Sequence, residues 1–228
     1  MKVTALIPAY NEEKWLPLTL AALRSRPEMS RVIVIDDGST DGTVHVAREA
    51  GADEVVTLAG NRGKGAALTE GARLIGGETD IVLLLDADLG SSATEFVKLL
   101  GPVADDEADM TIGMLPPDPA LLAAGRTGGG SGVVVRLARG GLYRRTGIEF
   151  AQPLSGQRAM KREVLAKIGG QFASGFGVEV ALTLSVVSAG FRIKEVETAF
   201  RHRVTGNGWA DLLHRGRQFA DVVHVLLR

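Results

Sequence analysis

Two aspartates, Asp86 and Asp88, follow an apolar run from Ile81 to Leu85 and stand one residue apart. Five consecutive apolar residues are typical of a strand buried on both faces, as in parallel sheets, where ligands bind beyond the carboxyl ends of strands. Carboxylates at such a position can hold a divalent cation, because hard cations take oxygen ligands. The alternative is that one aspartate caps a following helix or fills a tight turn. The pair alone leaves both interpretations open.

Three more polar segments follow apolar runs earlier in the chain, and they read PAYNEE, DDGSTDGT and NRGKG. Parallel strands end at the same edge of a sheet, so we expect these turns to lie near the two aspartates. Ser39 or Asp41 can cap the next helix, but their segment offers more carboxylates and hydroxyls than a cap requires. Gly63 and Lys64 place backbone N–H groups and a cation at a helix start, which suits a phosphate.

Short apolar runs alternate with helix-like periods through the first half of the chain, which predicts an α/β fold with a mainly parallel sheet. We expect strands at Val3–Ile7, Arg31–Asp36, Glu54–Leu58, Ile81–Asp86 and Asp109–Met114. The intervening helices are expected at Glu12–Leu23, Thr43–Ala50, Lys64–Ile75 and Thr94–Leu100.

The second half begins with a proline- and glycine-rich stretch from Leu115 to Ser131, which we interpret as a lid or substrate loop. No composition shift separates two independent domains. We therefore expect a single domain over residues 1–228, with a nucleotide-binding half at 1–114 and an acceptor-side half at 115–228. The elements expected after the loop are helices Val133–Arg145 and Val178–Ala189, strand Arg192–Val196 and an amphipathic terminal helix Trp209–Leu227.

Composition limits the classes of function. The formal net charge is −1 and 45% of the residues are hydrophobic, so nothing global favours nucleic-acid binding. The absence of cysteine excludes disulfides and zinc–thiolate sites and makes an intracellular setting the simpler expectation. The first residues do not resemble a signal peptide, and no apolar stretch is long enough to span a membrane.

The motifs PAYNEE, IDDGSTDGT, GKGAAL and LLLDADLG occur in this order and at comparable spacing in the family 2 glycosyltransferases, which this chain resembles over its first half. The resemblance implies a GT-A fold, Rossmann-like, that binds a nucleotide-diphosphate sugar together with Mg²⁺ or Mn²⁺. A Walker loop and a GxGxxG fingerprint are absent, which argues against an ATPase and a dinucleotide enzyme. A sugar-1-phosphate nucleotidyltransferase is not favoured either, because PAYNEE lacks the glycine-rich basic loop that it requires.

Carried over motif by motif, the resemblance assigns the nucleotide sugar to Pro8, Ala9, Tyr10, Glu12, Asp37, Gly63, Lys64, Asp86 and Ala87. Within this set, Asp37 would accept a base N–H, Lys64 would meet the phosphates and Asp86 would reach the ribose. Asp88 would bind the metal and so take part in catalysis. A cation there would stabilise the charge that develops on the leaving nucleoside diphosphate.

The second half resembles the retaining glucosyl-3-phosphoglycerate synthases, through QPLSG, FGVE and a late histidine. The resemblance implies that His202 is a further metal ligand and that Glu179 is catalytic. In an inverting reaction Glu179 would be the general base, whereas in a retaining one it would orient hydroxyls. The residues that follow the glycine run differ from the synthase pattern, which weakens the assignment of phosphoglycerate itself. The QxxRW signature of processive members is missing, so polymer synthesis is not expected.

The acceptor is expected to be a small phosphate-bearing molecule bound by Gly129, Gly130, Ser155 and Arg158. A lipid-linked acceptor is the alternative, because Ser155 to Ala159 also resembles the (T/S)GxRA element of dolichyl- and polyprenyl-phosphate sugar transferases. A third interpretation is a non-catalytic nucleotide-sugar-binding protein. We expect a cytoplasmic protein; peripheral contact with the inner face of the membrane through the arginines of Val133–Arg145, and a homodimer, stay open.

Overall fold

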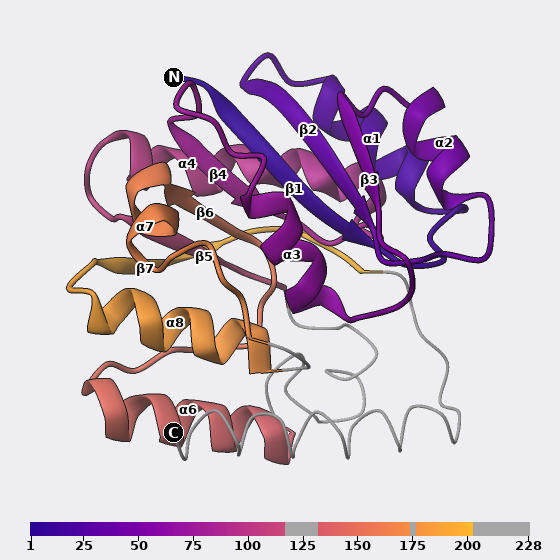
Figure 1. Cartoon of the computed structure of the whole chain (residues 1–228). Coiled ribbons are helices and arrows are strands. Elements are labelled where there is room, and N and C mark those ends of the chain that lie inside the picture. The colour runs from indigo at the N-terminus through magenta and orange to yellow at the C-terminus, as the bar shows by residue number, and fades with distance from the viewer. Residues whose placement is uncertain (117–131, 174–176, 203–228) are drawn as a thin grey trace.

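The computed structural model describes residues 1–116, 132–173 and 177–202. Within them lies a seven-stranded sheet with the order β3-β2-β1-β4-β6-β5-β7 (Figure 1). Its strands are β1 (Val3–Ala9), β2 (Met29–Asp36), β3 (Glu54–Thr57), β4 (Ile81–Leu84), β5 (Met110–Met114), β6 (Arg158–Lys161) and β7 (Ile193–Glu197). The predicted α/β fold with a mainly parallel sheet is confirmed.

Strand β6 is the one antiparallel member among the described strands, and it was not predicted. It pairs antiparallel with β4 on one side and with β5 on the other. Its four residues read RAMK, too short and mixed in character to be recognised as a strand. Because β6 runs in reverse, its beginning lies at the edge where the parallel strands end. The residues just before Arg158 are therefore delivered to the same edge as those just after β4.

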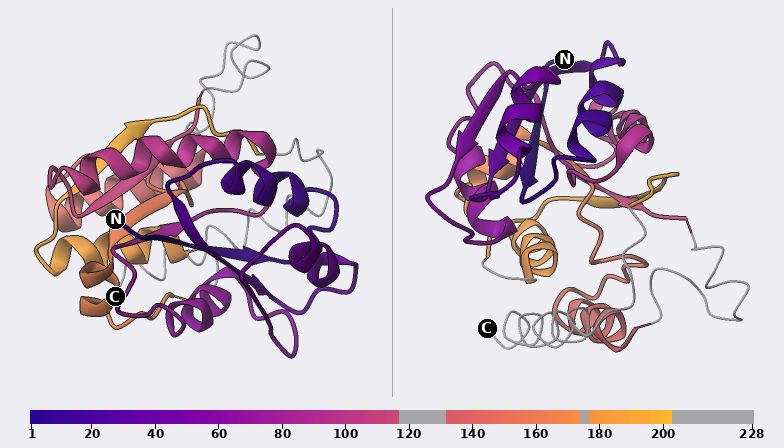
Figure 2. Two further views of the ribbon diagram at one scale, coloured as in Figure 1. Left: turned by 90° about the horizontal axis from the view of Figure 1, so that it is seen from above. Right: turned by 90° about the vertical axis from the view of Figure 1, so that its right-hand side faces the viewer.

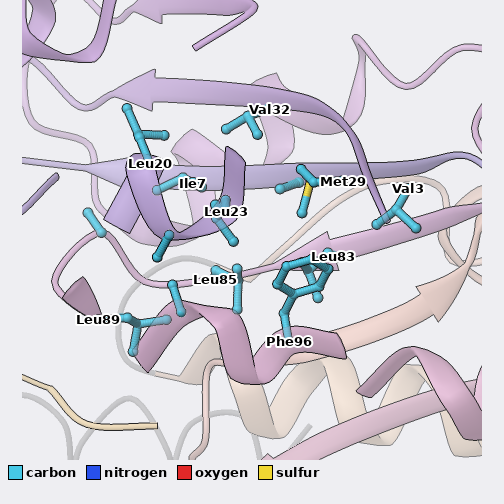
Figure 3. Packing of buried hydrophobic residues seen from close by; sticks show 14 of the residues in the cluster. Val3, Ile7, Leu20, Leu23, Met29, Val32, Leu83, Leu85, Leu89 and Phe96 are labelled. Carbon is cyan, nitrogen blue, oxygen red and sulfur yellow. The ribbon is translucent and has the colours of Figure 1, made fainter. Parts of the chain in front are cut away.

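Helices cover both faces of the sheet, and a separate hydrophobic core lies beneath each layer. One face carries α1 (Leu16–Arg24), α2 (Thr43–Glu49), the 3₁₀ helix η1 (Gly90–Glu95) and α4 (Phe96–Ala104). Figure 3 shows Leu20 and Leu23 of α1 together with Phe96 of α4 beside Leu83 of β4. The other face carries α3 (Lys64–Ala72), α7 (Arg162–Lys167), α8 (Val178–Ser188) and α6 (Val133–Thr146). Helix α6 lies outside α8, farther from the sheet (Figures 1 and 2).

Element ends differ from prediction where local chemistry stops the pattern. The first helix begins at Leu16 rather than Glu12, with a proline in its first turn, where the missing N–H costs nothing. Strand β4 ends at Leu84, so Asp86 stands in the connection that follows and not in the strand. The helix expected from Thr94 is instead η1 followed by α4. The predicted terminal helix and most of the predicted loop lie outside the described residues.

Register brings the strand ends together. Leu84 of β4 pairs with Leu6 of β1, and Ala9 of β1 pairs with Asp36 of β2. Two residues beyond the first pair, Asp86 comes level with Pro8. None of the described helices is long and apolar enough to cross a membrane.

A side-chain amide closes the base of the segment that joins β5 to β6. The Leu115 N–H donates to Gln152 Oε1 at 2.9 Å, and Gln152 Nε2 donates to the Leu115 carbonyl at 2.8 Å. Glu195 of β7 holds the same turn, because its carboxylate accepts the N–H groups of Ala151 and Gln152 at 2.7 and 2.6 Å. The segment therefore leaves and re-enters the sheet at a fixed point.

Candidate active site

A cavity of about 450 Å³ lies at the carboxyl ends of β1, β2 and β4. It is lined by Pro8, Ala9, Tyr10, Glu12, Asp37, Lys64, Asp86, Ala87, Asp88 and His202. Each of these residues was singled out from the sequence as nucleotide-sugar-binding or metal-binding, and Gly63 is the member of that set that does not line the cavity. We refer to this space as the larger cavity.

The turns after β1 and β2 are tied to each other, which shapes one wall of the larger cavity. Asn11 has a positive φ of 55°, and its side-chain Oδ1 accepts the N–H of Thr40 at 2.9 Å. The Asn11 N–H in turn donates to Ser39 Oγ at 2.9 Å. Asp41 Oδ1 accepts the N–H of Thr43, the first residue of α2, at 3.0 Å, but the N-cap position is occupied by Gly42 and no side chain caps this helix. The polar residues of this segment therefore hold the turn after β1 against the turn after β2.

Asp37 organises the turn into α3. Its two carboxylate oxygens accept the N–H groups of Arg62 and Gly63 at 2.8 and 2.7 Å. Gly63 has a φ of 89°, a conformation that glycine adopts without strain. This hydrogen bonding places Lys64 at the first position of α3, facing the cavity. Gly63 does not line the larger cavity, but its N–H donates to Asp37, which does.

Lys64 bridges two carboxylates from distant parts of the chain. Its Nζ donates to Asp86 Oδ1 at 2.6 Å and to Glu179 Oε1 at 2.9 Å. Burial alone would lower the pKa of Lys64, but the charges of Asp86 and Glu179 raise it above its ordinary value. Burial likewise opposes ionisation of Asp86, yet Lys64 and His202 hold its pKa below the usual range. Lys64 and Asp86 therefore form a charged pair near neutral pH.

The other oxygen of Asp86 is held by Gln157, a residue that was not assigned to the site from the sequence. Gln157 is fully buried, and its Nε2 donates to Asp86 Oδ2 at 2.7 Å. The same nitrogen lies 3.5 Å from His202 Nε2. Gln157 immediately precedes the antiparallel strand β6. If β6 had been recognised as a strand, Gln157 would have been placed at the edge of the cavity. The hydrophobicity pattern of β6 did not identify it as a strand.

Asp88 and His202 meet across the larger cavity, with Asp88 Oδ1 and His202 Nδ1 2.9 Å apart. That spacing fits two neighbouring ligands of one octahedral cation, which stand about 3 Å apart when each bond is about 2.1 Å. Burial lowers the pKa of His202, but Asp88 and Asp86 raise it more, so the net direction is upward. The 3₁₀ helix that follows has no side-chain N-cap, so neither Asp86 nor Asp88 serves as one.

The carboxylates and imidazoles in the described ranges do not by themselves form a cluster of three around a cation. Asp88 and His202 fit a divalent cation as a two-ligand site, with further oxygens supplied from outside the protein. Mg²⁺ is commonly bound in this way, through one or two protein ligands plus phosphate oxygens and water.

A smaller cavity of about 210 Å³ adjoins the first, and the two share Lys64, Asp86 and His202. The remaining residues of its wall are Leu115, Val135, Gln152, Leu154, Ser155, Gly156 and Glu179. Glu179 stands in the first turn of α8 and lines this cavity alone. Asp88, conversely, lines the larger cavity alone. The two cavities therefore meet at Lys64, Asp86 and His202.

The predicted acceptor-binding residues lie in different surroundings. Ser155 lines the smaller cavity, and its Oγ donates to the Gly113 carbonyl at 2.6 Å. Arg158 is fully buried and is not part of either cavity wall, because its guanidinium is turned toward backbone carbonyls and α8. Gly129 and Gly130 lie outside the described residues.

Comparison with known proteins finds glycosyltransferases among the relatives of this chain. The chain is 31% identical over 205 residues to the glycosyltransferase AglJ of Haloferax volcanii, covering 90% of this chain and 65% of that protein. It is 31% identical over 221 residues to the undecaprenyl-phosphate mannosyltransferase of Micrococcus luteus, covering 90% of this chain and 86% of that protein. The chain thus spans less than two thirds of AglJ and most of the mannosyltransferase.

Among solved structures, the glucosyl-3-phosphoglycerate synthase of Mycobacterium tuberculosis in complex with Mn²⁺, uridine diphosphate and phosphoglyceric acid matches with a TM-score of 0.78 and 28% identity. The match covers 99% of this chain and 77% of that one. Another structure of that enzyme contains Mg²⁺ and uridine diphosphate. The predicted GT-A fold and both predicted resemblances are confirmed. The family model for glycosyl transferase family 2 matches residues 4–169, and the chain belongs to that family.

Proposed function

We propose that this protein transfers a hexose from a nucleotide-diphosphate sugar of the UDP or GDP type to a small phosphate-bearing acceptor, with a divalent cation. The observation that carries the proposal is the junction of the two cavities at Lys64, Asp86 and His202. A donor in the larger cavity would present its sugar at this junction. An acceptor in the smaller cavity would meet it there, beside Glu179.

The larger cavity supplies the groups that a nucleotide sugar needs. Tyr10, with 42% of its surface exposed, offers an aromatic face at the cavity mouth against which a base can stack. Asp86 is fixed by Lys64 on one oxygen and Gln157 on the other, so its position for a ribose hydroxyl is set in advance. Lys64 lies where the diphosphate would pass from one cavity to the other.

Asp88 and His202 would hold Mg²⁺ or Mn²⁺, which supplies Lewis-acid stabilisation of the departing diphosphate when bound. The M. tuberculosis synthase, with Mn²⁺ and uridine diphosphate in its complexes, supports this assignment. Glu179 is the candidate for contact with the acceptor hydroxyl. It acts as general base if the anomeric configuration inverts and as an orienting group if the configuration is retained.

A second candidate acceptor is a polyprenyl phosphate, and a specific observation favours it. Leu115, Val135 and Leu154 give the smaller cavity an aliphatic wall. Beside it, α6 carries arginines and exposes Val133 and Tyr143, which suits peripheral contact with an anionic membrane. The similarity to the M. luteus mannosyltransferase supports the same acceptor class.

Calorimetric titration with UDP and GDP, with and without Mn²⁺, tests the donor half of the proposal. We expect one nucleotide to bind at least tenfold more tightly with Mn²⁺, and Asp88→Ala or His202→Ala to remove that gain. Asp105→Ala is the matched control, because Asp105 is an exposed aspartate at the end of α4. Nucleotide binding that ignores Mn²⁺ in the unmodified protein would contradict the metal assignment.

Transfer assays test the catalytic half. Incubation with UDP- and GDP-hexoses, Mn²⁺ and either 3-phosphoglycerate or a short prenyl phosphate is expected to release the nucleoside diphosphate and form a glycosylated product. If the donor binds but neither hydrolysis nor transfer occurs across a broad acceptor panel, the protein is a nucleotide-sugar-binding protein and not an enzyme.

A further inference from the structure

The segment before β6 folds back onto Arg158, the fully buried first residue of that strand. Arg158 donates from Nε to the Ser155 carbonyl and from one terminal nitrogen to the Pro153 carbonyl, each at 3.0 Å. Its other terminal nitrogen donates to Thr183 Oγ1 of α8, also at 3.0 Å. Burial lowers the pKa of Arg158 to about 10, so the guanidinium stays charged at neutral pH. A buried cation is thus held by carbonyl and hydroxyl oxygens.

This arrangement fixes the direction of two peptide groups. In a trans peptide the N–H points opposite to the carbonyl of the preceding residue, and the described chain contains no cis peptide. Because the Pro153 and Ser155 carbonyls point at Arg158, the N–H groups of Leu154 and Gly156 point away from it. Leu154 and Gly156 line the smaller cavity, whereas Arg158 does not.

Neither of these N–H groups forms a hydrogen bond with any residue in the described ranges. Gly156 is buried, and a buried N–H without a partner carries a free-energy cost that water or a ligand has to offset. Leu154 and Gly156 flank Ser155, whose own N–H donates to the Gln152 carbonyl at 3.1 Å. Backbone N–H groups grouped in a turn are a recurrent way in which proteins bind anions. The unpaired donors therefore indicate what the cavity accepts.

We propose that the N–H groups of Leu154 and Gly156 form an oxyanion site for the phosphate or carboxylate of the acceptor. The inference rests on the proposed function and names how its acceptor is held. Lys64 completes the site: a Cβ placed on Gly156 would lie 2.4 Å from Lys64 Nζ, so the ammonium stands directly beside this glycine. The Asp86 carboxylate lies beside the same glycine, 2.9 Å from that Cβ, and the charges of Lys64 and His202 offset its negative charge.

Arg158 is a positioning residue in this account, because it acts through the two peptide groups and touches no substrate. It also ties the site to α8, since Thr183 Oγ1, which accepts from Arg158, donates to the Glu179 carbonyl at 2.8 Å. One side chain therefore sets the distance between the oxyanion site and Glu179. The sequence-based assignment of Arg158 to the acceptor is replaced here by an indirect role.

Amide nitrogen chemical shifts report on the site directly. In protein labelled with ¹⁵N-leucine and ¹⁵N-glycine and loaded with UDP and Mg²⁺, a diamagnetic cation, the probes are inorganic phosphate, 3-phosphoglycerate and farnesyl phosphate. We expect saturable downfield proton shifts at Leu154 and Gly156 and none at Gly140, an exposed glycine of α6. A response to 3-phosphoglycerate identifies a small acceptor as the source of the anion, and a response to farnesyl phosphate alone identifies a lipid.

Replacing Leu154 or Gly156 by its α-hydroxy acid removes the N–H donor and leaves the side chain intact. We expect each ester to weaken acceptor binding by about tenfold or more, as for loss of a hydrogen bond to a charged group, and to leave UDP affinity within about twofold. The control ester is at Val133, the first residue of α6, whose N–H has no partner within the helix.

Two outcomes overturn the inference while leaving the donor proposal intact: acceptor binding with no response from either amide and no effect of either ester, or complete shifts of both amides with UDP and Mg²⁺ alone. The second would assign the oxyanion site to the donor diphosphate. Failure of UDP to bind the unmodified protein would instead refute the proposed function, and the titration separates that result from the others.

Discussion

Gly156 lines the smaller cavity beside the ion pair of Lys64 and Asp86, and any side chain at this position would meet that pair. An added Cβ would lie 2.4 Å from Lys64 Nζ and 2.9 Å from Asp86 Oδ2. Both atoms are at the ends of side chains, so the fold can accommodate the methyl group but the ion pair cannot stay in place. This glycine is required by the site and not by its backbone conformation, since its φ is not positive.

Gly156→Ala is expected to lower the affinity for UDP with Mn²⁺ by about tenfold, the amount that corresponds to one charge-assisted hydrogen bond. The melting temperature should change little. Gly140→Ala is the matched control: it leaves nucleotide binding unchanged and stabilises α6 by about 0.5–1 kcal/mol, because its Cβ would meet nothing within 4 Å. Equal nucleotide affinity in the two variants would show that Lys64 does not have to occupy its present position.

At the scale of elements, an ion cluster joins three strands at the edge opposite the site. Asp109 precedes β5 and accepts hydrogen bonds from Lys161 of β6 at 2.6 Å and from the side chain and backbone of Arg192, just before β7. Its side chain is only 10% exposed. The hydrogen bonds from Arg192, together with Lys161 and against the opposing effect of burial, hold the pKa of Asp109 well below its usual range. The cluster therefore stabilises the side of the sheet formed by β5, β6 and β7.

Asp109→Asn should lower the free energy of unfolding at pH 7 by about 2–3 kcal/mol, since it removes hydrogen bonds to a charged group. A depressed folded pKa contributes stability above the unfolded value of about 3.9, and this contribution is lost as the pH falls toward the folded pKa. The difference between variant and parent should therefore shrink below about pH 4. Urea unfolding at several pH values measures it. A difference that is constant down to pH 2.5 would rule out ionisation of Asp109 as its cause.

The helices and strands also show how much of the fold and of the site could be predicted from the sequence. Strong apolar runs predicted the parallel strands, and the motifs at their ends predicted the residues that line the larger cavity. The smaller cavity was harder, because it depends on β6, whose pattern is too short to recognise, and on backbone groups that have no signature in sequence. Gln157 and the N–H of Gly156 became visible only when the antiparallel pairing with β4 was known. Arg158 was identified by motif, but it is fully buried and lines neither cavity.

At the scale of the whole molecule, β1 and β4 lie inside the sheet and are covered on both faces, whereas β3 is an edge strand of partly exposed residues. The larger cavity is thus built on the most deeply buried strands. The first and second halves of the chain share one sheet, since β6 inserts between β4 and β5. Loss of β5, β6 and β7 would therefore expose the edge of β4, and Asp86 and Asp88 lie in the connection that follows this strand.

Native-state hydrogen exchange should show the slowest amides in β1 and β4, approaching the global free energy of unfolding. Exchange in β3 should be faster by at least about tenfold, because an edge strand opens without disrupting the core. Measurement by mass spectrometry of fragments that cover Val3–Ala9, Ile81–Leu84 and Glu54–Thr57 tests this order. Equal protection in all three would indicate that a further partner covers the β3 edge.

The amide clasp between Gln152 and Leu115 has a consequence for how such enzymes diversify. It fixes the two ends of the segment between β5 and β6, whatever residues lie between them. Doubling the length of a closed loop costs only about 0.6 kcal/mol, so a segment of another length can be accommodated without a shift of the strands. A chimaera that carries the corresponding segment of a relative would then exchange acceptor choice while its nucleotide preference stays that of the host.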